Sequence, residues 1–370
     1  MKLIKKHWPL ILVALLVGLF SILPLVFSLQ RMGDSFQGIW PQFNGDANFY
    51  LSRSHEVLDG HPEMNHQYFA EHKAITYPQA TGGELFLAFL ANTFNVSIPA
   101  IAAALTFIMP AIMAALFYVL LFMVYPNRFT SFLFPLFFLT AATGGMIKPI
   151  HPSISFPILL IFLISWFYLV LKKKNKTIAV LLCGVSLGVL FLTYFFHWSF
   201  LLVVLGIYGL ILLITKNYGS LKHHILFLIV AAVVAIPFFI RVLSGVDTPL
   251  YEDMVLRMGV FATHWPETFP RLAVALAWAA VFALVSRYYK LNHSNYAHII
   301  FALLIANIIY PNHQVITGVT IENANHWSFM PIFIYAISAH YLIHTIIERT
   351  HSKRSLLDKG IIGIIIIMLV

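Results

Sequence analysis

The stretch IPAIAAALTFIMPAIMAALFYVLLFMVY, residues 98–125, decides the class of fold. Its 28 residues include no Asp, Glu, Lys or Arg. A helix needs about 20 apolar residues to cross the hydrocarbon core of a bilayer. This stretch therefore predicts a transmembrane helix, and the rest of the chain repeats the pattern.

The composition extends this prediction to the whole chain. A length of 370 residues would normally suggest two or three soluble domains, but 60% of the residues are apolar and only 10% are charged. Soluble proteins carry about 25% charged residues, and disordered chains are poor in apolar ones. The 19 Gly and the single Cys exclude collagen-like and disulfide-rich proteins. The composition predicts an all-α polytopic membrane protein whose surroundings are the lipid bilayer.

Nine further apolar runs resemble the first, and we expect them to form one transmembrane domain over residues 1–370. These runs are 8–29, 129–144, 154–171, 177–195, 199–215, 225–240, 271–289, 297–310 and 328–347. An eleventh begins at Gly360 and is still apolar at Val370, so we expect about 10–11 spans and a chain that continues beyond Val370. The first run is about 22 residues long without a clear cleavage site, which favours a retained anchor over a signal peptide.

The distribution of charge predicts the orientation. With the N-terminus in the cytoplasm, 16 of the 23 Lys and Arg fall on the cytoplasmic side, and 12 of the 14 Asp and Glu fall outside. Lys and Arg collect on the cytoplasmic side of membrane spans. The net charge of +9 is therefore a topology signal, and we predict no nucleic-acid partner.

Three extracytoplasmic loops, 30–82, 241–270 and 311–327, contain most of the polar residues that are candidates for a functional site. The cytoplasmic loops are short and basic. None of them could house a nucleotide-binding domain, and the chain has no GxxxxGK[ST] phosphate-binding loop. A polar site is therefore expected at the outer face of the membrane.

The strongest local feature of the first loop is GDANFYLSR, residues 45–53. A helix that begins here places Asp46, Tyr50 and Arg53 on one face, because their spacings are 4 and 3. The dipole of a helix favours an ionised carboxylate at its N-terminus, which suits a general base or a metal ligand. A single Asp is also an ordinary helix cap, and the spacing alone leaves both interpretations open.

A membrane anchor followed by Asp46, Tyr50, Arg53 and the segment YPQATG, residues 77–82, resembles the membrane glycosyltransferases of the GT-C fold. That family includes oligosaccharyltransferase catalytic subunits and protein O-mannosyltransferases, and the resemblance covers roughly residues 8–125. It implies that Asp46 is the catalytic or metal-binding carboxylate. The outward-facing polar loops and the lack of a cytoplasmic nucleotide site imply that the donor is a lipid-linked sugar. The metal stays open, with a divalent cation, Mg or Mn, as the candidate cofactor.

One departure narrows the resemblance. Oligosaccharyltransferases usually carry a second acidic motif in the next outside loop, but residues 144–153 contain no acid. The family's Trp-Trp-Asp motif would lie beyond residue 370. The sequence therefore favours a general GT-C enzyme over an oligosaccharyltransferase.

The loop that contains residues 251–257 offers replacements for the missing groups. Glu252 or Asp253 could supply a second acid, and Arg257 or Lys148 could neutralise the phosphate of the donor, since guanidinium binds phosphate with two parallel hydrogen bonds. The segment could equally be a surface helix with a Glu252–Arg257 pair.

Residues 312–327 of the last outside loop form a stretch of sixteen residues, more than a turn needs, and are rich in amide and imidazole groups that suit sugar hydroxyls. The complete set of predicted substrate-binding residues is Tyr50, Arg53, Lys148, His151, Glu252, Asp253, Arg257, His264, His313, Gln314, Glu322, Asn323 and His326.

The sequence thus predicts an enzyme that transfers a sugar from a polyprenyl-phosphate donor to an extracytoplasmic acceptor. The alternative is a transporter or flippase for a lipid or a small solute, and a structural assembly subunit is a third interpretation. Transporters carry ionisable residues inside spans, and here His340 and His344 are the main examples. Convergence of polar groups at the outer face favours the enzyme, and convergence at the midplane favours the transporter. The sequence indicates neither the sugar nor the oligomeric state.

Overall fold

A computed structural model describes residues 7–36, 46–64, 75–76, 79–141, 150–171, 175–246, 248, 251–257, 259–266, 269–291, 294–320, 330–349, 360 and 362–363. Within these residues the chain is a bundle of helices. Its first half contains α2 (Trp8–Met32), η1 (Gly33–Ser35), α3 (Asp46–Leu58), α4 (Gly82–Phe94), α5 (Ile98–Val124), α6 (Arg128–Ala141), α8 (Ser155–Leu171) and α9 (Lys176–Thr193).

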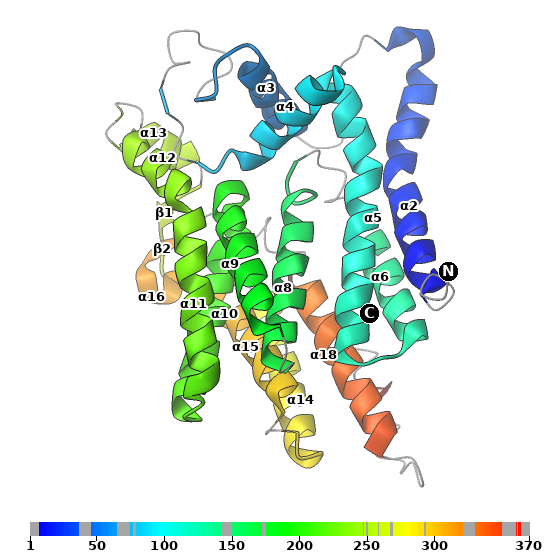
Figure 1. The fold of residues 1–370 in the computed structure, drawn as a ribbon, viewed down its shortest axis with the longest axis vertical. Coiled ribbons are helices and arrows are strands. Elements are labelled where there is room, and N and C mark those ends of the chain that lie inside the picture. The colour runs from blue at the N-terminus through cyan, green and yellow to red at the C-terminus, as the bar shows by residue number, and fades with distance from the viewer. Residues whose placement is uncertain are drawn as a thin grey trace.

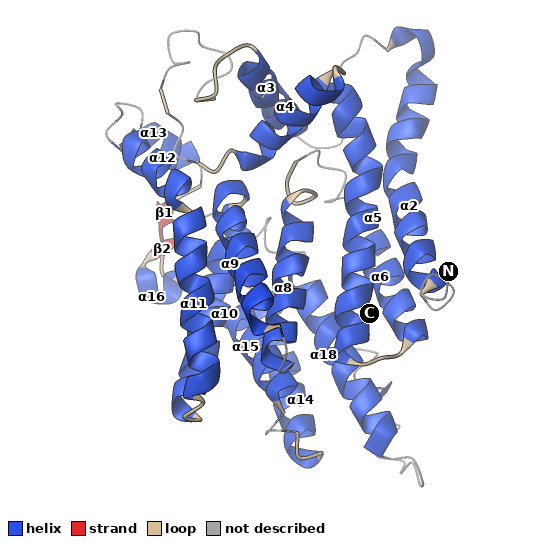
Figure 2. Cartoon of the chain, viewed as in Figure 1, coloured by secondary structure: helices blue, strands red, loops and turns tan. Residues whose placement is uncertain are grey.

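The second half continues the bundle and adds one pair of very short strands. Its elements are α10 (Phe195–Ile214), α11 (Tyr218–Val234), α12 (Ile236–Val246), α13 (Tyr251–Arg257), β1 (Phe261–Ala262), α14 (Phe269–Tyr288), α15 (Asn295–Ile309), η3 (Tyr310–Asn312), α16 (Gln314–Thr317), β2 (Val319–Thr320) and α18 (Met330–Arg349). Strands β1 and β2 pair antiparallel, and the other described residues are helix or loop (Figure 2).

The prediction of an all-α polytopic membrane protein is confirmed. A helix occupies each of the ten apolar runs. Six helices in the described part of the chain are long and apolar enough to cross a membrane, and a seventh span results if α11 and α12 are taken together. These two helices bend by 53° at Ala235, just before Pro237, whose ring removes a backbone donor and disturbs the helical ladder. Helices α6 and α8 are shorter, so the count of 10–11 spans stays a prediction.

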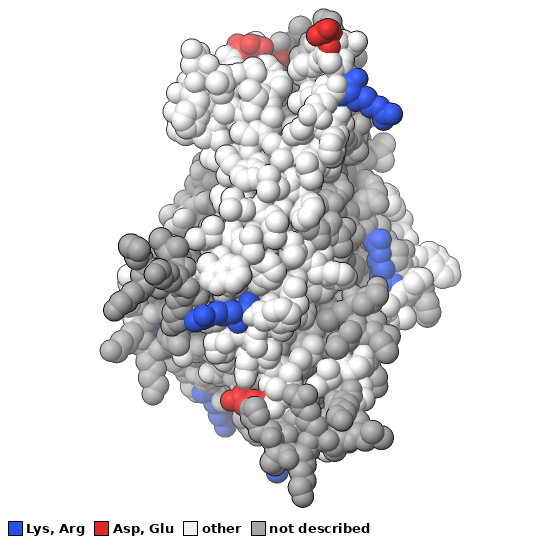
Figure 3. All heavy atoms as spheres, turned by 90° about the vertical axis from the view of Figure 1, so that its right-hand side faces the viewer, with Lys and Arg blue, Asp and Glu red and all other residues white. Residues whose placement is uncertain are grey.

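The helices connect in an up-and-down order, so their ends gather at two ends of the bundle (Figure 1). Helices α3, α4, α12 and α13 lie at one end, which we call the α3 end. The turns between α10 and α11 and between α14 and α15 lie at the opposite end. On the face shown in Figure 3, a broad belt below the α3 end carries no charged side chain. Such a belt is what a helical bundle needs where it meets hydrocarbon.

Two apolar clusters hold the bundle together. The larger one fills the space between the long helices and includes Trp166 and Phe117, both at most 1% exposed. The smaller one lies beneath α3 and α4, where Ala47 and Leu51 of α3 and Leu87 of α4 pack with residues of α5. This smaller cluster fixes the height and rotation of α3, and therefore the direction in which its polar face points.

Candidate functional site

Helix α3 places Asp46 at the edge of the α3 end. Asp46 lies in the first turn of the helix, and its side chain is half-buried. The next residue, Ala47, is 1% exposed in the apolar cluster beneath the helix. Because the buried residues anchor one side of α3, the first turn is held with its carboxylate close to the helix N-terminus, where the dipole favours the ionised form.

A stack of aromatic rings lies beside this turn. The ring of Tyr50 meets that of His151 edge to face, with 5.4 Å between centroids, and His151 stacks on Tyr194 at 4.8 Å with 17° between the planes. His197 meets the other side of Tyr194 edge to face at 4.8 Å. The stack joins α3, the segment before α8 and the junction of α9 with α10. His151 and His197 are only 4% and 3% exposed.

The electrostatics of Tyr194 show that Asp46 reaches this stack. Burial raises the pKa of Tyr194 well above its usual range, and Tyr50, Tyr310 and Asp46 add to the rise through their charges. The hydroxyl of Tyr310 lies 2.6 Å from that of Ser199. Asp46 and Tyr194 therefore interact electrostatically.

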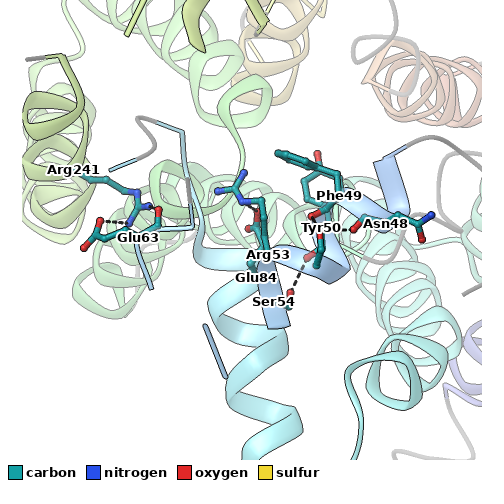
Figure 4. Close-up of polar contacts among 9 residues, drawn as sticks. Asn48, Phe49, Tyr50, Arg53, Ser54, Glu63, Glu84 and Arg241 are labelled. Carbon is teal, nitrogen blue, oxygen red and sulfur yellow. Dashed lines mark hydrogen bonds and ion pairs between the residues drawn. The ribbon is translucent and has the colours of Figure 1, made fainter. Parts of the chain in front are cut away.

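A sealed ion pair lies two helical turns along α3. The Nε atom of Arg53 is 3.4 Å from Oε1 of Glu84, and both side chains are 1% exposed (Figure 4). The guanidinium carbon of Arg53 also lies 5.0 Å from the centre of the Phe49 ring. Burial raises the pKa of the Glu84 carboxyl, and the positive charge of Arg53 opposes that rise. The pair joins α3 to α4 at a point without solvent.

Two glycines bring Glu84 to this position. A Cβ atom at Gly82 would lie 2.4 Å from the carbonyl oxygen of Leu192, and one at Gly83 would lie 2.3 Å from the Cγ2 atom of Ile150. The start of α4 therefore packs directly against the end of α9 and against the segment that carries His151. Any side chain here would push α4 away from both.

A second, more open pair continues the charged network. Arg241 of α12 donates a 2.5 Å hydrogen bond to the carbonyl oxygen of Glu63 and lies 3.8 Å from its carboxylate. Thr76 donates to the same carboxylate at 3.0 Å. Figure 4 shows Arg53 between this pair and the side chains of Phe49 and Tyr50. These contacts join residues 46–64 and residues 75–76 of the first loop to α12.

The segments around β1 and β2 form another joined unit. Gln314 donates from its amide to the carbonyl oxygen of Trp265 at 3.2 Å, and Nδ1 of His264 lies 3.3 Å from the carbonyl oxygen of Val315. His313 donates from Nδ1 to the carbonyl oxygen of Tyr310 at 2.9 Å. His313 thus joins this unit to Tyr310, which also raises the pKa of Tyr194. Tyr310 therefore links the segments around β1 and β2 to the aromatic stack.

The predicted site residues fall into four groups. Asp46, Tyr50 and His151 come together at the stack, and His264, His313 and Gln314 come together around β1 and β2. Arg53 is turned into the ion pair with Glu84, and Glu252 is exposed on α13. Lys148, Glu322, Asn323 and His326 lie outside the described residues, as do the side chains of Asp253 and Arg257. The substrate-binding roles of all these residues stay predictions.

Sequence reasoning did not select Glu84, Tyr194, Tyr310 or Arg241. Glu84 had a signal, because it is the single acid between Gly82 and Val124 and follows two glycines at the start of an apolar helix. The tyrosines had none, since Tyr and Trp are common where helices meet the membrane surface. No group of three or more His, Cys, Asp or Glu in the described part of the chain could hold a metal ion, and the Mg or Mn prediction stays open.

No protein-family model, no curated protein and no solved structure matches this chain. The chain is a multi-pass integral membrane protein by its helices, and its activity must be inferred from the geometry of its own site.

Proposed function

We propose that the chain is a membrane glycosyltransferase of the GT-C type that transfers a sugar from a polyprenyl-phosphate donor to an acceptor at the α3 end. One observation carries the proposal. A half-buried carboxylate, Asp46, stands at the start of a helix beside a buried stack of Tyr and His rings drawn from three parts of the chain. Polar groups that converge from distant segments are typical of a ligand site.

In the proposed reaction Asp46 is the general base. Asp46 accepts the proton of the acceptor hydroxyl, whose oxygen forms a bond to the anomeric carbon of the sugar. The bond from that carbon to the donor phosphate breaks, and the phosphate leaves with the electron pair. Alternatively, the Asp46 carboxylate would help to hold a divalent cation, which would supply charge neutralisation to the donor phosphate. Arg257 or Lys148 serves the leaving phosphate in this proposal, because Arg53 is already paired with Glu84.

The proposal places the α3 end outside the cell membrane and the N-terminus in the cytoplasm. The split of basic and acidic residues between the loops supports this orientation. The lone Cys183 is buried, so Cys183→Ala gives a background for labelling. Single cysteines at Gly60 and Thr177, both exposed, should react with a membrane-impermeant reagent from opposite sides. Labelling of both from the same side contradicts the orientation.

The alternative, a transporter or flippase, is favoured by one specific observation. His340 and His344 are 0% and 5% exposed within α18, a candidate span. Nε2 of His340 lies 3.1 Å from the carbonyl oxygen of Tyr125, and Nε2 of His344 lies 2.7 Å from the hydroxyl of Thr130. Buried ionisable groups inside spans often mark ion or substrate pathways, but both of these contacts join α18 to the turn between α5 and α6, at the end of those helices and not at their midplane.

One experiment separates the two functions. The full-length protein in lipid vesicles is given polyprenyl-phosphate sugars, a set of peptide and glycan acceptors, and nucleotide sugars as control donors. The enzyme proposal expects a covalent sugar–acceptor product that forms with the polyprenyl donor and not with the nucleotide sugar. Movement of the lipid-linked sugar between leaflets without any covalent product would overturn the glycosyltransferase and favour the flippase.

A further inference from the structure

The end of the bundle opposite the α3 end is rich in positive charge. Between Glu84 and Asp247 the sequence has no Asp or Glu, and seven of its nine Lys and Arg lie in the loops predicted to be cytoplasmic. Lys176 is the first residue of α9, and Lys222 lies in the first turns of α11. Neither helix has an acid in its first turn, although the dipole at a helix N-terminus favours negative charge. A negatively charged group from another molecule would be favoured at these two helix starts.

The starts of α9 and α11 share one polar recess. Lys176 lines it together with Ser220, His223 and His224, above Trp166 and Tyr208. Nδ1 of His223 donates to the carbonyl oxygen of Gly219 at 2.7 Å, which fixes the orientation of its ring. An ammonium group, a hydroxyl and an imidazole at the mouth of a recess match the oxygens of a phosphate group.

His224 connects this recess to an apolar groove. It is 5% exposed, and its Nδ1 atom has no hydrogen-bond partner among the described residues. It lines the polar recess on one side and the groove on the other. The groove runs between α10 and α11 and is lined by Leu202, Gly206, Gly209, Leu213, Leu221 and Leu228. A Cβ atom at Gly206 would meet nothing within 4 Å, and one at Gly209 would meet only Nε2 of His224, at 3.7 Å.

We propose that this site binds an anionic phospholipid. Its phosphate contacts Lys176, Ser220 and His223, and one acyl chain lies along the groove beside Gly206 and Gly209. The ligand is a lipid because the phosphate-binding groups continue, through His224, into a groove whose other lining residues are Leu and Gly of two helices that are apolar enough to cross a membrane. Basic recesses between transmembrane helices commonly bind anionic headgroups. The site is separate from the proposed transferase site and does not depend on it.

The test measures lipid retained by the purified full-length protein in detergent, by native mass spectrometry, with phosphatidylglycerol and phosphatidylcholine of identical acyl chains. The wild type should retain phosphatidylglycerol at lower lipid concentration than phosphatidylcholine. Lys176→Gln should weaken phosphatidylglycerol binding about fivefold, which corresponds to the usual contribution of one lysine near a membrane surface. Lys290→Gln, an exposed lysine at the turn between α14 and α15, is the matched control and should have no effect.

Gly209→Leu tests the groove without changing charge. Leu has a higher helix propensity than Gly, so the variant should fold, while its side chain fills the groove and weakens the binding of both lipids. Equal retention of the two lipids by the wild type overturns the proposal. Equal loss in Lys176→Gln and Lys290→Gln, or full retention in Gly209→Leu, also overturns it.

Discussion

Helix α3 carries two ionisable residues, Asp46 and Arg53, that the sequence places on one face but that the fold treats in opposite ways. Asp46 is half-buried and acts electrostatically on the Tyr194 stack. Arg53 is 1% exposed and paired with Glu84. A solvent-excluded ion pair can position a helix but cannot bind a substrate. A partly exposed carboxylate can be reached by a substrate and can bind it. This difference suggests that Asp46, at the start of α3, takes part in the reaction and that Arg53, in its middle, supports the fold.

The largest effect on stability is expected from breaking the sealed pair. Arg53→Met leaves the carboxylate of Glu84 buried without its counter-charge, which should cost about 3–5 kcal/mol of unfolding free energy at neutral pH. Thermal unfolding of the full-length protein in detergent measures the loss. The double variant Arg53→Met with Glu84→Leu should recover most of the stability, because apolar replacement of a buried pair is often neutral or stabilising. A double variant as unstable as Arg53→Met would contradict a purely structural pair.

The next prediction concerns pH. Burial raises the pKa of Glu84 above its ordinary value of 4.5 in the folded protein, against the opposing effect of Arg53. The folded state then binds this proton more tightly than the unfolded state, so stability should fall as the pH rises from about 4.5 to the raised pKa and change little above it. Each unit of increase corresponds to about 1.4 kcal/mol. Unfolding of the wild type minus that of Glu84→Gln isolates this contribution, and a difference that grows with pH contradicts it.

A somewhat smaller effect is expected at the contact between α4 and the aromatic stack. Gly83→Ala places a methyl group 2.3 Å from Ile150 and 3.0 Å from the ring of His151. Overpacking of this kind typically costs about 1–3 kcal/mol, and here it should also displace His151 from Tyr194. Gly206→Ala, where the added atom meets nothing within 4 Å, is the matched control. It should be neutral or stabilise by up to about 1 kcal/mol. Equal destabilisation by both variants would show that the close packing at Gly83 is not the cause.

The smallest effect is expected at the open pair. Glu63 and Arg241 are 43% and 18% exposed, and pairs near solvent contribute about 0–1 kcal/mol. Glu63→Gln keeps the backbone carbonyl that accepts from Arg241, so its unfolding temperature should stay near that of the wild type. A loss as large as that of Arg53→Met would mean that the two pairs act as one buried network.

The sequence predicts the helical bundle well because the bilayer imposes a strict requirement on each span. Runs such as 98–125 and 177–195 must satisfy their own backbone polar groups, and only helices do so within one segment. The start of α3 was also predictable, since Asp46 is an acid suited to a first helical turn and the first residue of a one-sided polar pattern. Strands β1 and β2 were not expected, because their pairing depends on contacts between loops that lie far apart in the sequence.

The site was only partly predictable, for a physical reason. Helical periodicity places Asp46 and Arg53 on one face, but it does not specify that Glu84 of another helix will seal Arg53 from solvent. Tyr194 and His151 come together through the packing of α4 on α9, which requires the two glycines of α4. Contacts of this kind depend on tertiary structure, and no local spacing encodes them.

The central claim is that Asp46 supplies a carboxylate to sugar transfer, and one comparison tests it directly. Asp46→Asn keeps the size of the side chain and its ability to cap α3, since Asn caps about as well as Asp. Glu56→Gln makes the same acid-to-amide change ten residues further along the same helix. Turnover per folded molecule is measured with a polyprenyl-phosphate donor. We expect a loss of about 10²–10⁴-fold for Asp46→Asn and near-wild-type turnover for Glu56→Gln. Near-wild-type turnover of Asp46→Asn would show that Asp46 is only a helix cap.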